Sequence, residues 1–168
     1  MDRDQLRTLQ APLKARYRDE PSAALVTLSA EGTLGEGVSC SVQTGRALAT
    51  AGLHPASGGD GSLLCSGDML LEALAACAGV TLRAVATSLG IDVRSGTVRA
   101  EGDLDFRGTL GVDRDAPVGF RAIRLSIAVD ADADDEQLAT LLRLTERYCV
   151  VLQTIAAGTR PAATIARA

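Results

Sequence analysis

The longest apolar stretch of the chain spans residues 65–89, and between Met69 and Leu89 only Glu72 and Arg83 carry charge. A step of about 100° per residue predicts one long helix that is apolar on nearly every side. One face of this helix carries Leu70, Leu74, Cys77, Thr81 and Val85. Such a helix must be covered on almost all sides, so the rest of the chain is expected to be organised around it.

The ends of this helix have recognisable signals. Ser66 or Asp68 is expected to cap its start, because a short oxygen-bearing side chain accepts hydrogen bonds from the free N–H groups of the first turn. Gly90 follows Leu89 and is expected to end the helix, since glycine adopts the left-handed conformation at little cost.

The segment before the helix predicts strands and a loop. Residues 25–30 are apolar and β-branched in character, and residues 38–42 alternate, so we expect two antiparallel strands joined by a glycine-rich turn. Residues 45–53 are small and ambiguous. Residues 54–62 are rich in glycine and serine and predict a flexible loop that leads into the helix.

After Gly90 the apolar and polar residues alternate with a period of two. Residues 97–106, with Val93 before them, and residues 120–129 predict two long strands with one covered face and one wet face. The connection 107–119 holds Pro117 and several glycines, so we expect it to be long and mobile.

Two further helices flank this pattern. Residues 3–18 predict a short amphipathic helix that Pro12 interrupts. An acidic start at residues 132–137 predicts a helix that runs unbroken to Ala157 by pattern alone, with Gly158 stopping it. Residues 161–168 are then expected to form a closing strand.

Pairs of strands between helices predict an α+β fold with antiparallel sheets around the long apolar helix. We assign residues 1–20 to an N-terminal helical lead-in and residues 21–168 to a single domain. One thin sheet and one other helix cover such a helix only in part. The simplest additional cover is a second copy of the chain, so we predict a homodimer with this helix at its centre.

Composition and charge exclude several classes of function. The 168 residues carry a net charge of −4 with interspersed signs, and no basic patch alternates with aromatic residues, so nucleic-acid binding has no support. The charged start Met1-Asp2-Arg3-Asp4 does not resemble a secretory signal. No uninterrupted apolar span of about 18 residues exists, so we expect a cytoplasmic protein that does not cross a membrane.

The candidate chemistry rests on cysteine. The chain has four cysteines and one histidine, His54, and no CxxC spacing, so neither a metal site nor a cysteine–histidine catalytic pair is expected. Cys77 and Cys149 both lie on predicted core helices, where they form either inert buried thiols, the commoner situation, or a dithiol couple. Cys65 lies about 18 Å along the helix from Cys77, too far for a disulfide.

A reactive Cys77 would need a cation, because a thiol in apolar surroundings resists ionisation. Arg83 lies on a different face of the helix, so Arg16 or Arg18 in the N-terminal segment is the better candidate. Asp68 lies on the opposite face from Cys77, so it could reach that thiol only from a partner subunit.

Three segments resemble the OsmC/Ohr family of organic hydroperoxide reductases. They are Gly58-Gly59-Asp60-Gly61, the stretch Met69 to Cys77 that ends in Ala-Ala-Cys, and Leu89-Gly90-Ile91-Asp92-Val93. The later stretch Leu138 to Val151, with Tyr148-Cys149-Val150-Val151, resembles the second half of the same pattern. The similarity covers roughly residues 25–168.

The resemblance implies an intertwined homodimer and a thiol-dependent peroxidase for organic hydroperoxides. Cys77 would match the peroxidatic cysteine and Cys149 the resolving cysteine, with a disulfide formed between them. Arg18, with Arg16 second, would match the activating arginine. No cofactor is implied, and an external dithiol of lipoyl type would reduce the disulfide. A non-catalytic dimer that binds a hydrophobic ligand is the alternative.

Two positions depart from the family pattern. Ser66-Gly67-Asp68 stands where the family often has Asn-Pro-Glu, so the glutamate that orients the arginine is missing or replaced by Asp68. Val150 follows Cys149 where the family often has a proline that breaks the helix.

Overall fold

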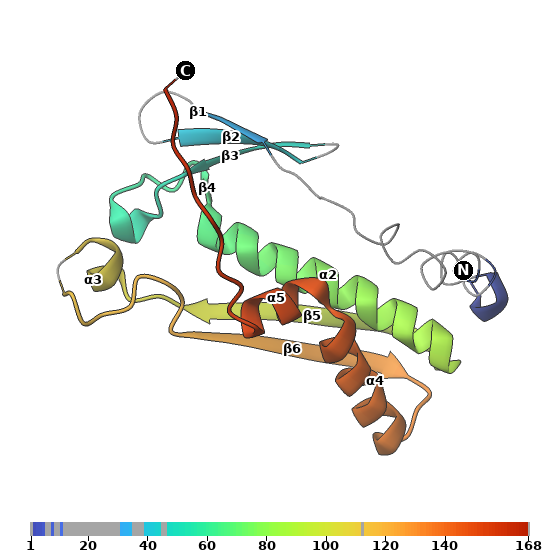
Figure 1. Ribbon diagram of the computed structural model, residues 1–168. Helices are drawn as coiled ribbons and strands as arrows, with labels where there is room; N and C mark the ends of the chain where they lie inside the picture. Colours follow the sequence, from blue (N-terminus) through green and yellow to red (C-terminus); the bar gives the residue numbers. More distant parts are fainter. Residues whose placement is uncertain are drawn as a thin grey trace.

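The computed structural model describes the backbone of residues 2–5, 8, 11, 31–34, 39–44, 47–111 and 113–167, and it describes no side chain between residues 31 and 48. Within this part the chain forms two sheets, one long helix and several shorter helices, of which two pack beside the long one (Figure 1). Residues 3–5 are helical, as the sequence predicts. Arg16, Arg18 and the strand expected over residues 25–30 lie outside the described residues.

The first sheet has the strand order β1–β2–β3–β4, with β1 at Glu31–Leu34, β2 at Ser39–Thr44, β3 at Ala47–Gly52 and β4 at Leu64–Cys65. β1 lies where the sequence predicts a turn, so that prediction is wrong. Pairing with β2, in the register Leu34 opposite Cys40, outweighs the local turn preference of the glycines. β3 and β4 pair in parallel over two residues.

The long helix is α2, Ser66–Leu89. Its N-cap residue is Cys65, which makes no side-chain capping bond, so the predicted cap by Ser66 or Asp68 is wrong. The helix starts directly after β4, so the pairing of β4 with β3 fixes the position at which the chain enters α2. Gly90 ends the helix at φ +74°, as predicted, and its N–H donates to the carbonyls of Ala86 and Thr87.

The second sheet pairs β5, Val93–Asp103, with β6, Ala122–Ala131, antiparallel. Side chains of β6 alternate strictly between half-buried and exposed, which confirms the predicted covered and wet faces. The connection between these strands contains the short helix α3, Phe106–Thr109, which the sequence pattern did not predict. There Gly108 is buried against the backbone carbonyls of Ala116 and Pro117, where a side chain would not fit.

The helices that follow are α4, Asp135–Tyr148, and α5, Val150–Ala156. Asp134 caps α4 in a capping box with Gln137, in line with the predicted acidic start. The predicted unbroken helix to Ala157 is wrong, because the chain bends at Cys149. The predicted closing strand is also wrong: residues 159–167 pair with no strand, and Ile165 is fully exposed.

α2 lies along the β5–β6 sheet, and α4 and α5 pack against α2 (Figure 1). One buried cluster joins the second half of α2 to α4 and contains Leu82, Ala86, Ile91, Val93 and Leu141. The other cluster joins the first half of α2 to the α4–α5 junction and contains Leu74, Ala78 and Cys149.

Only one stripe of α2 is buried in the single chain. Its buried residues recur every four positions, at Leu74, Ala78, Leu82 and Ala86. On another face Val80 is 72% exposed, and Ala73 and Ala76 beside it are exposed as well. α2 is long and apolar enough to cross a membrane by length and composition, but core helices of soluble proteins pass the same test, so this is weak evidence for a membrane span.

Candidate active site

The structure brings Cys77 and Cys149 together. Cys77 lies midway along α2, and Cys149 is the residue between α4 and α5. Cys149 is fully buried with Leu74 and Ala78, and the half-buried Cys77 packs against this cluster. The two cysteines are far apart in sequence, and the packing of the α4–α5 junction on α2 places them side by side.

The bend at Cys149 gives the site its donors. Cys149 has φ −72° and ψ 106°, an extended conformation between two helices. Its own N–H still donates to the Thr145 carbonyl, 2.9 Å, as in a continuing helix. The next N–H groups, those of Val150 and Val151, leave the helix pattern and face the Cys77 thiol.

These donors change the ionisation of Cys77. Burial raises the pKa of the Cys77 thiol, but hydrogen bonds from the Val151 N–H, the Cys149 thiol, the Val150 N–H and the Thr81 hydroxyl together lower that pKa below its ordinary value. Each of these bonds is stronger when the sulfur is negatively charged. Cys77 is therefore the thiol of the pair that ionises first.

The pKa of Cys149 shifts in the opposite direction. Burial raises the pKa of Cys149, and the neighbouring Cys77 raises it further, because Cys149 donates a hydrogen bond to Cys77 and loses it on ionisation. The pair thus combines a partly accessible thiol of lowered pKa with a buried thiol of raised pKa. This asymmetry suits a nucleophile and a second thiol that reacts after it.

Thr81 is a site residue to which the sequence pattern assigned no role beyond the helix face. It lies one turn beyond Cys77 on α2, a spacing that places the two side chains on the same face. Three other helical threonines, Thr87, Thr145 and Thr154, donate to the carbonyl four residues earlier. Within the described part of the chain, Thr81 makes no such bond to the backbone, and its hydroxyl bonds to Cys77.

The other cysteines lie elsewhere. Cys65 is half-buried at the start of α2, and its sulfur lies beside Gly67 near the Phe120 ring. Cys40 lies in β2 opposite Ala51, and its side chain is not described. The structure thus gives Cys65 no contact with Cys77, as the helical spacing predicts.

The two charged candidates that the structure describes, Arg83 and Asp68, lie away from the thiols. Arg83 donates to the Val93 carbonyl at the start of β5, so it is bound away from Cys77. Asp68 is exposed in the first turn of α2, roughly 14 Å along the helix from Cys77. Within the residues that the structure describes, no cation reaches the thiol pair, and no group of three or more histidine, cysteine or acidic side chains gathers as metal ligands.

His54 has a structural role in the loop before α2. Its Nδ1 accepts from the Ala56 N–H at 3.0 Å and so caps the short 3₁₀ helix Pro55–Ser57. Its ring stacks on Phe106 with 5.0 Å between centroids. These contacts hold the loop against α3 and do not place the imidazole at the cysteines.

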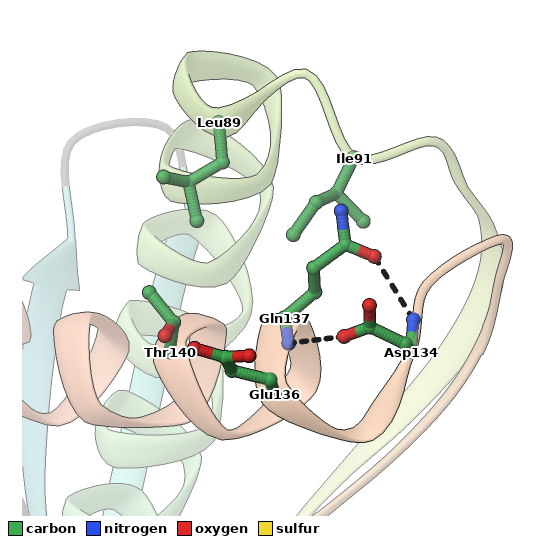
Figure 2. A pocket seen from close by; sticks show the side chains of 6 residues that line it. All are labelled: Leu89, Ile91, Asp134, Glu136, Gln137 and Thr140. Carbon is green, nitrogen blue, oxygen red and sulfur yellow. Dashed lines mark hydrogen bonds between the residues drawn. The ribbon is translucent and has the colours of Figure 1, made fainter.

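A hollow of about 260 Å³ lies at the far end of α2, beside the start of α4 (Figure 2). Leu89 and Ile91 form its apolar wall. Asp134 accepts from the Gln137 N–H at 2.8 Å, and the Gln137 side chain accepts from the Asp134 N–H at 2.9 Å. Glu136 and Thr140 complete the lining, so these six residues include no cysteine or histidine.

Structures of known proteins share this fold. An OsmC-like protein from Mycoplasma pneumoniae matches with a TM-score of 0.66 and 18% identity, over 78% of this chain and 88% of that one. An organic hydroperoxide resistance protein OsmC from Legionella pneumophila matches with a TM-score of 0.55 and 18% identity, over 78% and 90% of the two chains. OhrB, the organic hydroperoxide resistance protein of Bacillus subtilis, matches with a TM-score of 0.53 and 17% identity, over 77% and 90%.

Sequence comparison adds the family. No curated protein matches the chain significantly. The family described as "OsmC-like protein" matches residues 59–162, which include α2, both long strands, α4 and α5. Because this match covers more than half of the chain and the fold agrees with it, the chain belongs to the OsmC-like family.

Proposed function

We propose that the protein is a thiol-dependent peroxidase that reduces organic hydroperoxides through Cys77 and Cys149. The observation that carries this proposal is the packing of Cys77 of α2 against the buried Cys149 at the α4–α5 junction. The lowered pKa of Cys77 and the raised pKa of Cys149 support it. Two structural neighbours named as organic hydroperoxide resistance proteins support the same role.

In the proposed reaction the opposite pKa shifts assign the two roles. The Cys77 thiolate attacks the terminal oxygen of the hydroperoxide, the O–O bond breaks, and the alkoxide leaves and takes up a proton as the alcohol. Cys77 is oxidised to a sulfenic acid. The Cys149 thiol then attacks that sulfur, hydroxide leaves with the Cys149 proton as water, and a Cys77–Cys149 disulfide forms.

The cycle closes with an external reductant. A dithiol, of lipoyl type in this proposal, reduces the disulfide by exchange and is itself oxidised to a disulfide. Arg18 is proposed to supply the cation near Cys77, with Arg16 as the second candidate. Location in the cytoplasm stays a prediction.

A homodimer is part of the proposal. It is supported by the apolar face of α2 that the single chain leaves exposed, which carries Ala73, Ala76 and Val80. A helix that is apolar all round requires cover, and a second copy of α2 would supply it without any additional kind of partner.

Binding of a hydrophobic ligand without turnover is the second candidate. An open apolar hollow of about 340 Å³ lies between α2, β6 and α4, and it is lined by Leu82, Ile127, Val129, Leu138, Ala139, Leu141 and Leu142. Apolar hollows of this size accept small ligands. This function would require neither Cys77 nor Cys149.

The test uses single cysteine variants. The reduced protein receives one equivalent of cumene hydroperoxide, and the intact mass and linked peptides are measured. We expect loss of two hydrogens and a link between the Cys77 and Cys149 peptides. Cys77→Ser should abolish peroxide consumption, Cys149→Ser should trap the sulfenic acid, and Cys65→Ser should behave as the parent protein.

Two results would overturn the proposal. One is peroxide consumption by Cys77→Ser equal to that of the parent protein. The other is a folded parent protein that consumes no hydroperoxide with a dihydrolipoyl reductant present, which would favour the ligand-binding function.

A further inference from the structure

The junction between α4 and α5 bends without a proline. In a continuous helix the Val150 N–H would donate to the Glu146 carbonyl four residues earlier. Here Cys149 is extended and the next bond of the helix pattern runs from the Gln153 N–H to the Cys149 carbonyl, 2.9 Å. A proline at position 150 would enforce such a bend by removing this N–H and by crowding that carbonyl, but the residue there is valine.

The bend leaves one carbonyl without its helical donor. The Val150 N–H faces the Cys77 thiol and no longer reaches the Glu146 carbonyl. The side-chain amide of Gln153 replaces it: its Nε2 donates to the Glu146 carbonyl at 2.9 Å, across the bend from α5 to α4. The partner is a carbonyl oxygen, so the amide must present its nitrogen.

This bond exists only in the bent form. If α4 and α5 joined into one helix, the Glu146 carbonyl would accept from Val150, and the Gln153 side chain would lose its acceptor. The bond therefore favours the bent form over the straight form. The bent form is also the one in which the N–H groups of Val150 and Val151 reach Cys77.

We propose that Gln153 is a positioning residue that holds the α4–α5 bend in place of a proline and so keeps the backbone donors of residues 150 and 151 on Cys77. The proposal deepens the peroxidase function and rests on it for its biological meaning. Gln153 itself is exposed and does not touch the reacting sulfur atoms.

The test measures Cys77 in the reduced protein, with no peroxide present. Gln153→Ala is alkylated with iodoacetamide over a range of pH, and the rate at Cys77 is followed by peptide mass. We expect the midpoint of alkylation to move to higher pH, and the rate below that midpoint to fall about three- to tenfold, the range for loss of one hydrogen bond. Gln137→Ala is the matched control, because it removes a side-chain bond to the backbone at the other end of α4.

A proline variant separates positioning from general destabilisation. Val150 is the first residue of α5 and is exposed, a helix position that proline favours. The extended Cys149 suits the residue before a proline. We expect Val150→Pro, added to Gln153→Ala, to recover most of the alkylation rate, since the Val151 donor remains.

Two outcomes would overturn the proposal: an alkylation profile of Gln153→Ala equal to that of the parent protein, or a double variant no faster than Gln153→Ala. Circular dichroism checks that each variant is folded. Because alkylation needs no peroxide, a parent protein that fails to consume hydroperoxide would contradict the proposed function and leave this test of Gln153 intact.

Discussion

Cys77 and Cys149 differ in the neighbours that their sulfur atoms meet. Cys77 is half-buried, and hydrogen bonds from two backbone N–H groups, a hydroxyl and a thiol lower its pKa. Cys149 is fully buried, and the effect of burial on its pKa exceeds that of the hydrogen bonds from the Leu152 and Val151 N–H groups. Hydrogen bonds favour the charged form of the first sulfur, and burial disfavours the charged form of the second. The chemical roles proposed for the two residues follow from this difference.

At the scale of single residues, a Thr81 variant tests whether its hydroxyl lowers the pKa of Cys77. Thr81→Val removes the hydroxyl donor and keeps the shape of the side chain, so the pKa of Cys77 should rise towards its ordinary value. At any pH below this pKa a smaller fraction of Cys77 would then be ionised. Alkylation of Cys77 in that pH range should therefore slow about three- to tenfold.

The matched control is Thr87→Val on the same helix. The Thr87 hydroxyl donates to the Arg83 carbonyl and lies away from the thiols, so its alkylation profile should equal that of the parent protein. Equal profiles for Thr81→Val and Thr87→Val would show that the Thr81 hydroxyl has no influence on Cys77.

At the scale of elements, α2 holds the site through a narrow buried stripe. Leu74 is fully buried against Ala78 and Cys149, one turn before Cys77. The same helix carries Cys77 and forms the surface on which the α4–α5 junction packs. A smaller side chain in this part of α2 should therefore lower the stability of the protein and change how closely the two thiols approach each other.

Leu74→Ala tests this dependence. A cavity beneath Cys149 should lower the free energy of unfolding by about 2–5 kcal/mol, measured by denaturant titration at one protein concentration. Disulfide formation after peroxide should also slow, because Cys149 is less well held.

Leu110→Ala is the control, since Leu110 is 56% exposed and its truncation should change the free energy of unfolding by less than about 1 kcal/mol. A Leu74→Ala variant as stable as Leu110→Ala would contradict the described packing.

At the scale of the whole molecule, the single chain leaves much of α2 uncovered. The β5–β6 sheet, α4 and α5 cover one side of the helix, and Val80 is exposed on another side. An exposed apolar helix face of this kind is typical of an interface. The proposed homodimer would bury it.

Val80→Asp tests the dimer. Placing a carboxylate in an apolar interface costs several kcal/mol when it has no partner, so the variant should sediment as one chain of 17.3 kDa, while the parent protein sediments at twice that mass. Val118→Asp is the control, since Val118 is similarly exposed at 65% but lies in the loop before β6. A monomeric parent protein, or a dimeric Val80→Asp variant, would contradict the proposal.

Some of this molecule is readable from its sequence. The predicted features depend on the local spacing of apolar residues and on local capping residues. They are the extent of α2 and its end at Gly90, the two long strands with alternating faces, the acidic start of α4 and the separation of Cys65 from Cys77. Such features involve residues close together in the chain, and side-chain periodicity reports them directly.

Other features were decided by tertiary structure alone. β1 and β3 exist because β2 pairs with both, and β4 directs the chain into α2 without the predicted side-chain cap. The bend at Cys149 interrupts a sequence pattern that is compatible with one continuous helix. The N–H groups of the bend that face Cys77 lie more than 70 residues from it in the chain, and one sequence does not display the partner of such a long-range bond. The lowered pKa of Cys77 belongs to this second group, because a pKa is set by neighbours in space.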